Sequence, residues 1–118
     1  MAHILLVDDS RTSRKILRSI LEENGHTIIG EATNGKDGVD KYKALKPDLV
    51  TMDITMPVLD GLEALRQIIE FDEAAKIIMV TAAGQKSKMV DALKFGASEF
   101  LAKPFEHNQI VEIINKVL

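Results

Sequence analysis

Residues 49–53 of the chain read LVTMD, a short apolar run that ends in a carboxylate. A continuous apolar run of this length is typical of a strand that is buried on both faces of a parallel sheet. The same pattern appears near the start of the chain, where residues 4–9 read ILLVDD. The two stretches therefore predict buried strands that deliver acidic residues at their carboxyl ends.

Strand and helix signals alternate along the rest of the 118 residues. Further short runs predict strands at residues 27–32, 77–80 and 99–102. Helical spacing, with capping and breaking residues, predicts helices at residues 12–23, from Asn34 to about Lys46, after Asp60, at residues 86–95 and along an apolar stripe at residues 110–117. The apolar side of the first helix is expected to consist of Ile16, Leu17, Ile20 and Leu21.

Five βα units in succession predict a doubly wound α/β fold, a three-layer sandwich with helices on both faces of a parallel sheet. The crossovers between parallel strands are expected to be right-handed. In open sheets of this kind, ligands bind beyond the carboxyl ends of the strands. Functional residues are therefore expected directly after the first, third, fourth and fifth strands.

Composition and charge limit the classes of function. The length suits one domain, which we expect to span residues 1–118. The net charge of −3 argues against a nucleic-acid partner, and the basic residues Arg11, Arg14, Lys15 and Arg18 are expected to form a solvated face of the first helix. The apolar run at residues 4–7 is too short for a signal peptide or a membrane span. The lack of cysteine excludes disulfides and thiolate metal sites and suits the cytoplasm.

Polar residues of three kinds are expected to converge at the carboxyl edge of the sheet. In chain order they are Asp8, Asp9, Asp53, Thr81 and Lys103. Each has an ordinary explanation when taken alone, because aspartates often cap helices or occupy turns and a lysine before proline is usually solvated. Their occurrence together, at four strand ends of one sheet, favours a functional site.

The chemistry of this set points to a phosphoryl acceptor that works with Mg²⁺. Three clustered carboxylates repel one another and resist full ionisation until a cation binds. Oxygen ligands without cysteine or a nearby histidine suit Mg²⁺. Asp53 can then act as a carboxylate nucleophile that forms an aspartyl-phosphate. Lys103 and Thr81 can contact the phosphoryl oxygens.

Over essentially its whole length, the chain resembles the receiver domain of bacterial response regulators. The resemblance rests on VDDS at residues 7–10, MDITMP at 52–57, DG at 60–61, VTA at 80–82 and AKPF at 102–105. It implies a flavodoxin-like (βα)5 fold with the parallel strand order 2-1-3-4-5. It also implies a two-component signalling domain that accepts a phosphoryl group from a histidine kinase and catalyses only its own phosphorylation and dephosphorylation.

The resemblance further implies which residues form the phosphorylation site. Asp8 and Asp9 would hold Mg²⁺ together with Asp53 and the backbone carbonyl of Thr55. Asp53 would be the phosphoacceptor, and Lys103 would contact the phosphate.

A second set of residues would form the switch. Thr81 would supply a hydroxyl that turns toward the phosphoryl group, and Phe100 would turn inward behind it. Phe100 lacks the hydroxyl that a tyrosine would offer there, and a plain core role for this residue stays open. The bond before Pro104 is expected to be cis. We expect the switch to change the face formed by the fourth helix, the fifth strand and the last helix.

The expected partners are a histidine kinase and a downstream protein, which could be a motor switch, an adaptor or a phosphotransfer protein. Residues 8–15 are more similar to chemotaxis-type receivers, and we expect a monomer. Three alternatives stay open: a phosphorelay intermediate, a receiver cut from a longer regulator with an output domain, and a flavin- or nucleotide-binding enzyme. The paired aspartates after the first strand argue against the last, because they would repel a phosphate that had no metal ion beside it.

Overall fold

The computed structural model describes residues 1–118 and contains five strands and five helices in alternation. The strands are β1 (His3–Val7), β2 (Thr27–Ala32), β3 (Leu49–Asp53), β4 (Ile77–Thr81) and β5 (Glu99–Ala102). The helices are α1 (Arg11–Glu23), α2 (Gly35–Leu45), α3 (Gly61–Phe71), α4 (Lys86–Lys94) and α5 (His107–Val117). None of these helices combines the length and the apolar character needed to cross a bilayer.

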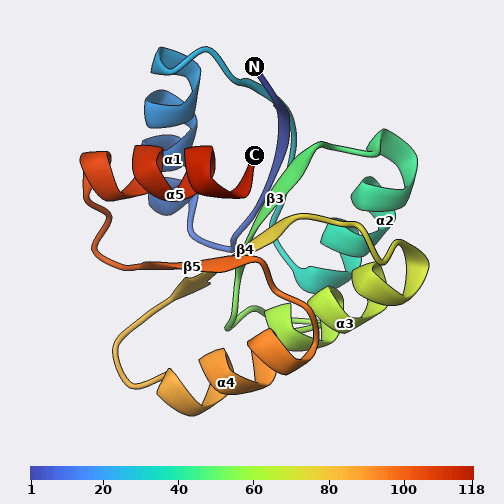
Figure 1. The fold of residues 1–118 in the computed structure, drawn as a ribbon. Coiled ribbons are helices and arrows are strands. Elements are labelled where there is room, and N and C mark those ends of the chain that lie inside the picture. The colour runs from blue at the N-terminus through green and yellow to red at the C-terminus, as the bar shows by residue number, and fades with distance from the viewer.

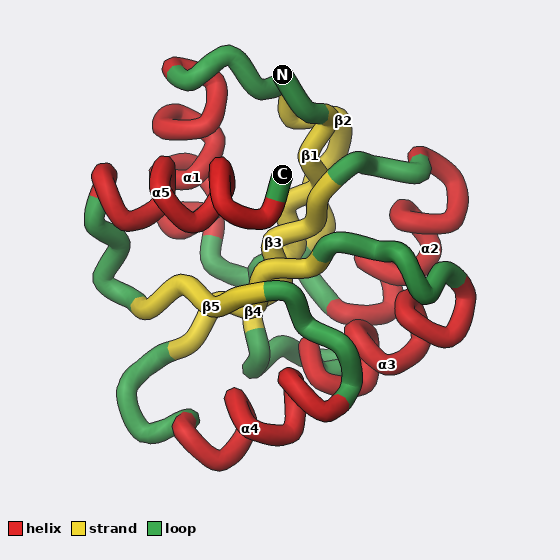
Figure 2. The backbone as a smooth tube through the Cα atoms, in the orientation of Figure 1, coloured by secondary structure: helices red, strands yellow, loops and turns green.

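The strands form one parallel sheet in the order β2-β1-β3-β4-β5. Helices α1 and α5 cover one face, and α2, α3 and α4 cover the other (Figures 1 and 2). The predicted doubly wound, three-layer fold is therefore confirmed. Because the chain turns from one side of β1 to the other, the carboxyl ends of β1 and β3 border the crevice where such sheets bind ligands.

Each face of the sheet has its own apolar core. In β1, Leu5 and Val7 belong to the core under α2 and α3, whereas Ile4 and Leu6 belong to the core under α1 and α5. All four side chains are fully buried. Since successive strand residues point to opposite faces, the continuous apolar run is explained by burial on both sides.

Three helices begin at capping side chains that the sequence supplies directly. Ser10, Asn34 and Asp60 precede α1, α2 and α3, and each side chain accepts a hydrogen bond from the backbone N–H three residues later. These caps satisfy N–H groups that a helix start would otherwise leave without partners. By contrast, α4 and α5 begin without a side-chain cap.

The prediction for the apolar side of α1 is wrong at one position. Ile16 is 43% exposed, whereas Leu17 and Leu21 are buried against the sheet and Ile20 is partly buried. Successive helical residues point about 100° apart, so Ile16 faces solvent when Leu17 faces the core. The buried stripe of α1 is therefore narrower than its apolar composition suggests.

Candidate functional site

The carboxyl ends of three neighbouring strands bring buried polar residues to one edge of the sheet. Asp8 follows β1, Asp53 ends β3 and Thr81 ends β4. These residues are 2%, 7% and 4% exposed, respectively. Because β1, β3 and β4 pair in this order, the three side chains lie along one continuous edge. Lys103 follows β5, the next strand along.

Three carboxylates form a compact acidic cluster at this edge. Asp8, Asp9 and Asp53 each offer one oxygen, and these oxygens all lie within 4.8 Å of one another. Asp8 and Asp53 are buried, whereas Asp9 is exposed and opens the cluster to solvent. Oxygens at this spacing suit a hard divalent cation that keeps part of its water shell.

One oxygen of the cluster is buried and accepts no hydrogen bond. Asp8 Oδ1 accepts from the Ser10 backbone N–H at 2.8 Å, but Asp8 Oδ2 has no donor. The Lys103 ammonium lies 3.3 Å from Asp8 Oδ2 and 3.8 Å from Asp53 Oδ2. This contact is an ion pair by distance without hydrogen-bond geometry at the Asp8 oxygen. A buried carboxylate oxygen that receives a nearby charge but no hydrogen bond is only partly compensated for its lost solvation, and a metal ion bound to it would complete the compensation.

The surroundings of Asp53 disfavour its charged form. Burial is the largest cause, and the negative charge of Asp8 adds to it, so the pKa of Asp53 is raised to about 6. The Lys103 ammonium acts in the opposite direction, and Asp9 again raises the pKa. A carboxylate whose charge is both desolvated and repelled gains most from a cation or a neighbouring donor.

The residues predicted to form the switch make no contact with the acidic cluster in this arrangement. The Thr81 hydroxyl donates to the backbone carbonyl of Leu101 at 3.4 Å, across to β5. Phe100 is half-buried and packs against the core on the α2–α3 side. The Lys103–Pro104 peptide bond is cis. The Thr81 hydroxyl is therefore turned to the neighbouring strand in this arrangement.

A close backbone approach fixes the segment after Asp53. The Gly61 N–H donates to the carbonyl of Ile54 at 2.7 Å. A Cβ atom at Gly61 would lie 1.9 Å from the carbonyl oxygen of Asp53. Only glycine allows this contact, so the start of α3 is held directly against the end of β3.

Comparison with known proteins identifies the family of this site. The response regulator receiver domain family matches residues 4–115. The chain belongs to this family. The chemotaxis protein CheY of Bacillus subtilis is 50% identical over 119 residues, which cover 100% of this chain and 99% of that protein. CheY of Thermotoga maritima is 47% identical over 114 residues, which cover 97% of this chain and 95% of that protein.

A solved receiver structure confirms the fold. The crystal structure of the complex of CheX and CheY with BeF3 and Mg²⁺ from Borrelia burgdorferi matches this chain with a TM-score of 0.93 and 38% sequence identity. The match covers 98% of this chain and 87% of that chain. The receiver fold and the domain's place in two-component signalling are thus shown, and the acidic cluster lies at the carboxyl edge, where open sheets of this kind bind ligands.

Arg14 has a role in this receiver that sequence reasoning missed. It was expected on a solvated face, but its side chain is 13% exposed. Its guanidinium donates to the backbone carbonyl of Asp8 at 2.6 Å and to the Glu31 carboxylate at 2.9 Å. Arg14 therefore ties the loop after β1, which carries the acidic pair, to the end of β2. Helical spacing alone gives no sign of this contact.

Gln85 is a second residue that sequence reasoning left without a role. Its side-chain oxygen accepts from the Ala82 backbone N–H at 2.6 Å, and its Nε2 donates to the Thr55 hydroxyl oxygen at 2.7 Å. Gln85 thus joins the segment after β4 to the segment after β3 at the carboxyl edge of the sheet. Only the three-dimensional structure shows the hydrogen bond between Gln85 and Thr55, since these two residues are 30 positions apart in the sequence.

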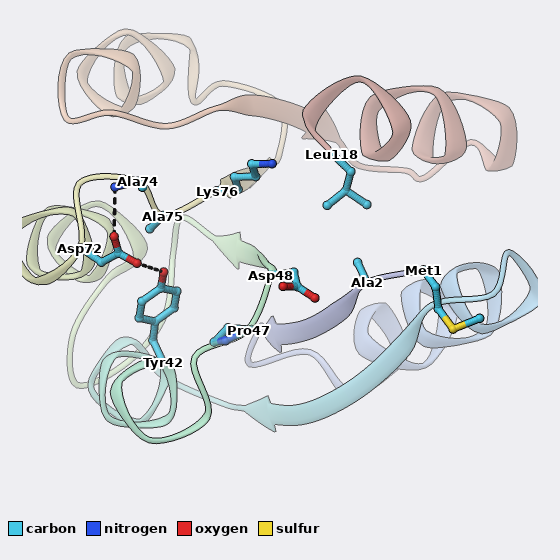
Figure 3. A pocket seen from close by; sticks show the side chains of 10 residues that line it. All are labelled: Met1, Ala2, Tyr42, Pro47, Asp48, Asp72, Ala74, Ala75, Lys76 and Leu118. Carbon is cyan, nitrogen blue, oxygen red and sulfur yellow. Dashed lines mark hydrogen bonds between the residues drawn. The ribbon is translucent and has the colours of Figure 1, made fainter.

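The largest hollow of the receiver lies at the other edge of the sheet. It measures about 410 Å³ and is lined by Tyr42 of α2, by residues before β1 and β3 such as Asp48, and by the segment before β4, which includes Asp72 (Figure 3). The acidic cluster contributes nothing to this hollow. This hollow is therefore separate from the acidic cluster at the carboxyl edge.

Proposed function

We propose that residues 1–118 act as a single receiver domain in which Asp53 accepts a phosphoryl group from a histidine kinase. The observation that carries this proposal is the cluster of Asp8, Asp9 and Asp53 at the carboxyl edge, with Lys103 beside it. Asp53 is the only member that ends a strand, and the Lys103 ammonium contacts both buried carboxylates, at 3.3 Å from Asp8 Oδ2 and 3.8 Å from Asp53 Oδ2. This placement suits the nucleophile, with the other groups arranged around it.

The residues present fit a Mg²⁺ ion. Its ligands would be the carboxylates of Asp8, Asp9 and Asp53 and the backbone carbonyl of Thr55. Asp8 Oδ2 is buried and has no hydrogen-bond donor, so a bound cation would stabilise this oxygen most. When bound, Mg²⁺ would neutralise the clustered charge and stabilise negative charge on a phosphoryl oxygen. All four donors are hard oxygen ligands of the kind this ion prefers.

The chain's own residues would carry the transfer as follows. An oxygen of the Asp53 carboxylate attacks phosphorus while the phosphorus–nitrogen bond of the kinase phosphohistidine breaks. The imidazole leaves as the neutral base after taking a proton from solvent. The Lys103 ammonium, already within 3.8 Å of Asp53, stabilises the phosphoryl oxygens as a point charge. Arg14 holds the loop of the acidic pair in place through the Asp8 carbonyl.

Phosphorylation would then bias a switch. The Thr81 hydroxyl leaves its long hydrogen bond to Leu101 and turns to the phosphoryl oxygen, and Phe100 turns into the space behind it. The face formed by α4, β5 and α5 responds. In α4 only Ala92 is buried, whereas Val90 and Leu93 are exposed, so this helix is weakly anchored and offers apolar contacts.

The proposed role is chemotaxis-type signalling in the cytoplasm by a monomeric protein. The relatives that support it are named chemotaxis protein CheY and match nearly their full length to this chain. The downstream partner would be a motor switch, an adaptor or a phosphotransfer protein. The complex of CheY with CheX from Borrelia burgdorferi supports a protein as the partner class. The chain would catalyse only its own phosphorylation and dephosphorylation.

The experiment that tests the proposal is phosphorylation by acetyl phosphate, measured by intact mass with and without Mg²⁺. The wild-type protein should gain one phosphoryl group only with Mg²⁺, and Asp53→Asn should gain none. The matched control is Asp40→Asn, an exposed aspartate of α2 that pairs with Lys36 and should behave as wild type. Equal labelling of Asp53→Asn, or labelling that does not depend on Mg²⁺, would overturn the proposal.

A further inference from the structure

Gln85 occupies an unusual position at the start of α4. It stands at the residue before the helix, where the corresponding side chains of α1, α2 and α3 cap their own helices. The Gln85 side chain makes no such cap and reaches away from the helix instead. Its two hydrogen bonds, from Ala82 N–H to Oε1 and from Nε2 to the Thr55 hydroxyl, define the Gln85 bridge.

The Gln85 bridge spans the two segments that must act together in the switch. Ala82 directly follows Thr81, whose hydroxyl is turned to Leu101 in this arrangement. Thr55 lies two residues after Asp53. The bridge therefore fixes the backbone next to the switch hydroxyl relative to the segment next to the phosphoacceptor. Both of its hydrogen bonds are short, at 2.6 and 2.7 Å.

Turning Thr81 toward Asp53 would disturb this geometry. Thr81 and Ala82 share a peptide unit, so a backbone shift that accompanies the inward turn of the Thr81 hydroxyl also displaces the Ala82 N–H. A hydrogen bond weakens steeply as its length and angle depart from the ideal. The loop can accommodate the change because Gly84 has a positive φ of 85° with open space around it. The bridge thus belongs to the arrangement with Thr81 turned away.

We propose that Gln85 is a positioning residue that opposes the switch in the unphosphorylated protein. This inference rests on the proposed function of Asp53 and Thr81. Gln85 does not touch the reacting atoms and acts through Ala82 and Thr55. A contact made in only one of two arrangements shifts their equilibrium by its own net free energy. For exposed hydrogen bonds this corresponds to about a fivefold change in the equilibrium constant.

The test uses BeF3⁻ as the phosphoryl probe, titrated with Mg²⁺ into the full chain. Gln85→Ala should bind BeF3⁻ about fivefold more tightly than wild type, because the opposing bridge is gone. Thr55→Val keeps the backbone carbonyl but loses the hydroxyl, so it should tighten binding by a smaller factor. Adding Thr55→Val to Gln85→Ala should bring no further gain, since the same bridge is already broken.

The matched control is Gln67→Ala. Gln67 also donates a side-chain hydrogen bond at a partly exposed site, to Glu63 at 3.2 Å on α3, but it touches neither segment of the bridge. Its BeF3⁻ affinity should equal that of wild type.

A second measurement needs neither metal ion nor BeF3⁻. In the unliganded protein, the Ala82 amide resonance of Gln85→Ala should shift toward the position it takes in BeF3⁻-bound wild type.

The outcomes separate the two proposals. If wild type binds BeF3⁻ with Mg²⁺ but Gln85→Ala binds it equally or more weakly, the role of Gln85 is wrong and the function of Asp53 stands. If additional tightening appears in the double variant, the bridge is not the shared cause and the inference fails. If wild type itself binds no BeF3⁻ and takes no phosphoryl group, the proposed function is overturned and the inference falls with it.

Discussion

At the carboxyl edge of the sheet, Asp8 Oδ2 is buried without a hydrogen-bond donor, whereas both oxygens of Asp72 near the amino edge accept hydrogen bonds. Asp72 receives one from the Tyr42 hydroxyl at 2.8 Å and one from the Ala74 backbone N–H at 3.1 Å (Figure 3). Asp48 at the same edge accepts from the His3 N–H at 2.8 Å. The amino edge thus satisfies its carboxylates, and the carboxyl edge does not.

The difference shows what each edge contributes. Satisfied polar groups stabilise the fold, because the hydrogen bonds compensate for lost solvation. The clustered carboxylates of the carboxyl edge, with Asp8 Oδ2 left without a donor, destabilise the isolated domain and are stabilised when a cation offsets their charge. A ligand that binds this edge therefore stabilises the protein. If it binds one of two arrangements of the fold more tightly, it shifts the equilibrium toward that arrangement.

The largest expected effect comes from Gly61, where backbone packing rather than charge shapes the carboxyl edge. Gly61→Ala places a Cβ atom 1.9 Å from the Asp53 carbonyl oxygen and 2.9 Å from the Ile54 Cα atom. Backbone must move to relieve this clash, so the variant should lose more than about 3 kcal/mol of unfolding free energy in urea denaturation. It should also impair phosphorylation, because the displaced backbone is that of Asp53.

A matched glycine separates the clash from the loss of backbone freedom. Gly25 follows α1 with a positive φ of 86°, and no atom would lie within 4 Å of an added Cβ. Gly25→Ala should therefore lose only about 1 kcal/mol and keep full phosphorylation. Similar losses in the two alanine variants would contradict the close-approach argument.

The contrast between the edges also shows what the sequence can predict. The strand order, the alternating cores and the convergence of Asp8, Asp9 and Asp53 follow from apolar runs that end in polar residues, together with the resemblance to receivers. Contacts such as those of Arg14 and Gln85 do not follow from such patterns. They depend on the direction that a long side chain takes once the backbone has folded. The spacing of residues in the sequence does not predict that direction.

The second effect concerns the raised pKa of Asp53 in the protein without Mg²⁺. A carboxyl whose folded pKa lies at about 6, above its ordinary value of 3.8, destabilises the fold at high pH and ceases to do so as the pH falls and it becomes protonated. Asp53→Asn should therefore gain about 2 kcal/mol of unfolding free energy near pH 8, and this gain should shrink by more than half near pH 4.5. Urea denaturation in a chelator at both pH values measures it.

Addition of Mg²⁺ provides the control for this prediction. Near pH 8 the ion should stabilise wild type more than Asp53→Asn, because the variant has one carboxylate fewer to bind it. The difference in unfolding free energy between Asp53→Asn and wild type should then become smaller. A gain that is the same at both pH values, or that Mg²⁺ leaves unchanged, would show that packing rather than charge accounts for it.

The smallest effect is expected at the amino edge, where the polar groups are already satisfied. Tyr42 is buried, its ring packs edge-on against Phe71, and burial together with its hydrogen bond to Asp72 raises the pKa of its phenol. Tyr42→Phe keeps the ring and removes only the hydroxyl, so it should lose about 1 kcal/mol in urea denaturation. Because Tyr42 lies away from the acidic cluster, BeF3⁻ affinity should match wild type. If this affinity changed as well, the two edges would be coupled through the sheet, and the separation of a stabilising edge from a switching edge would fail.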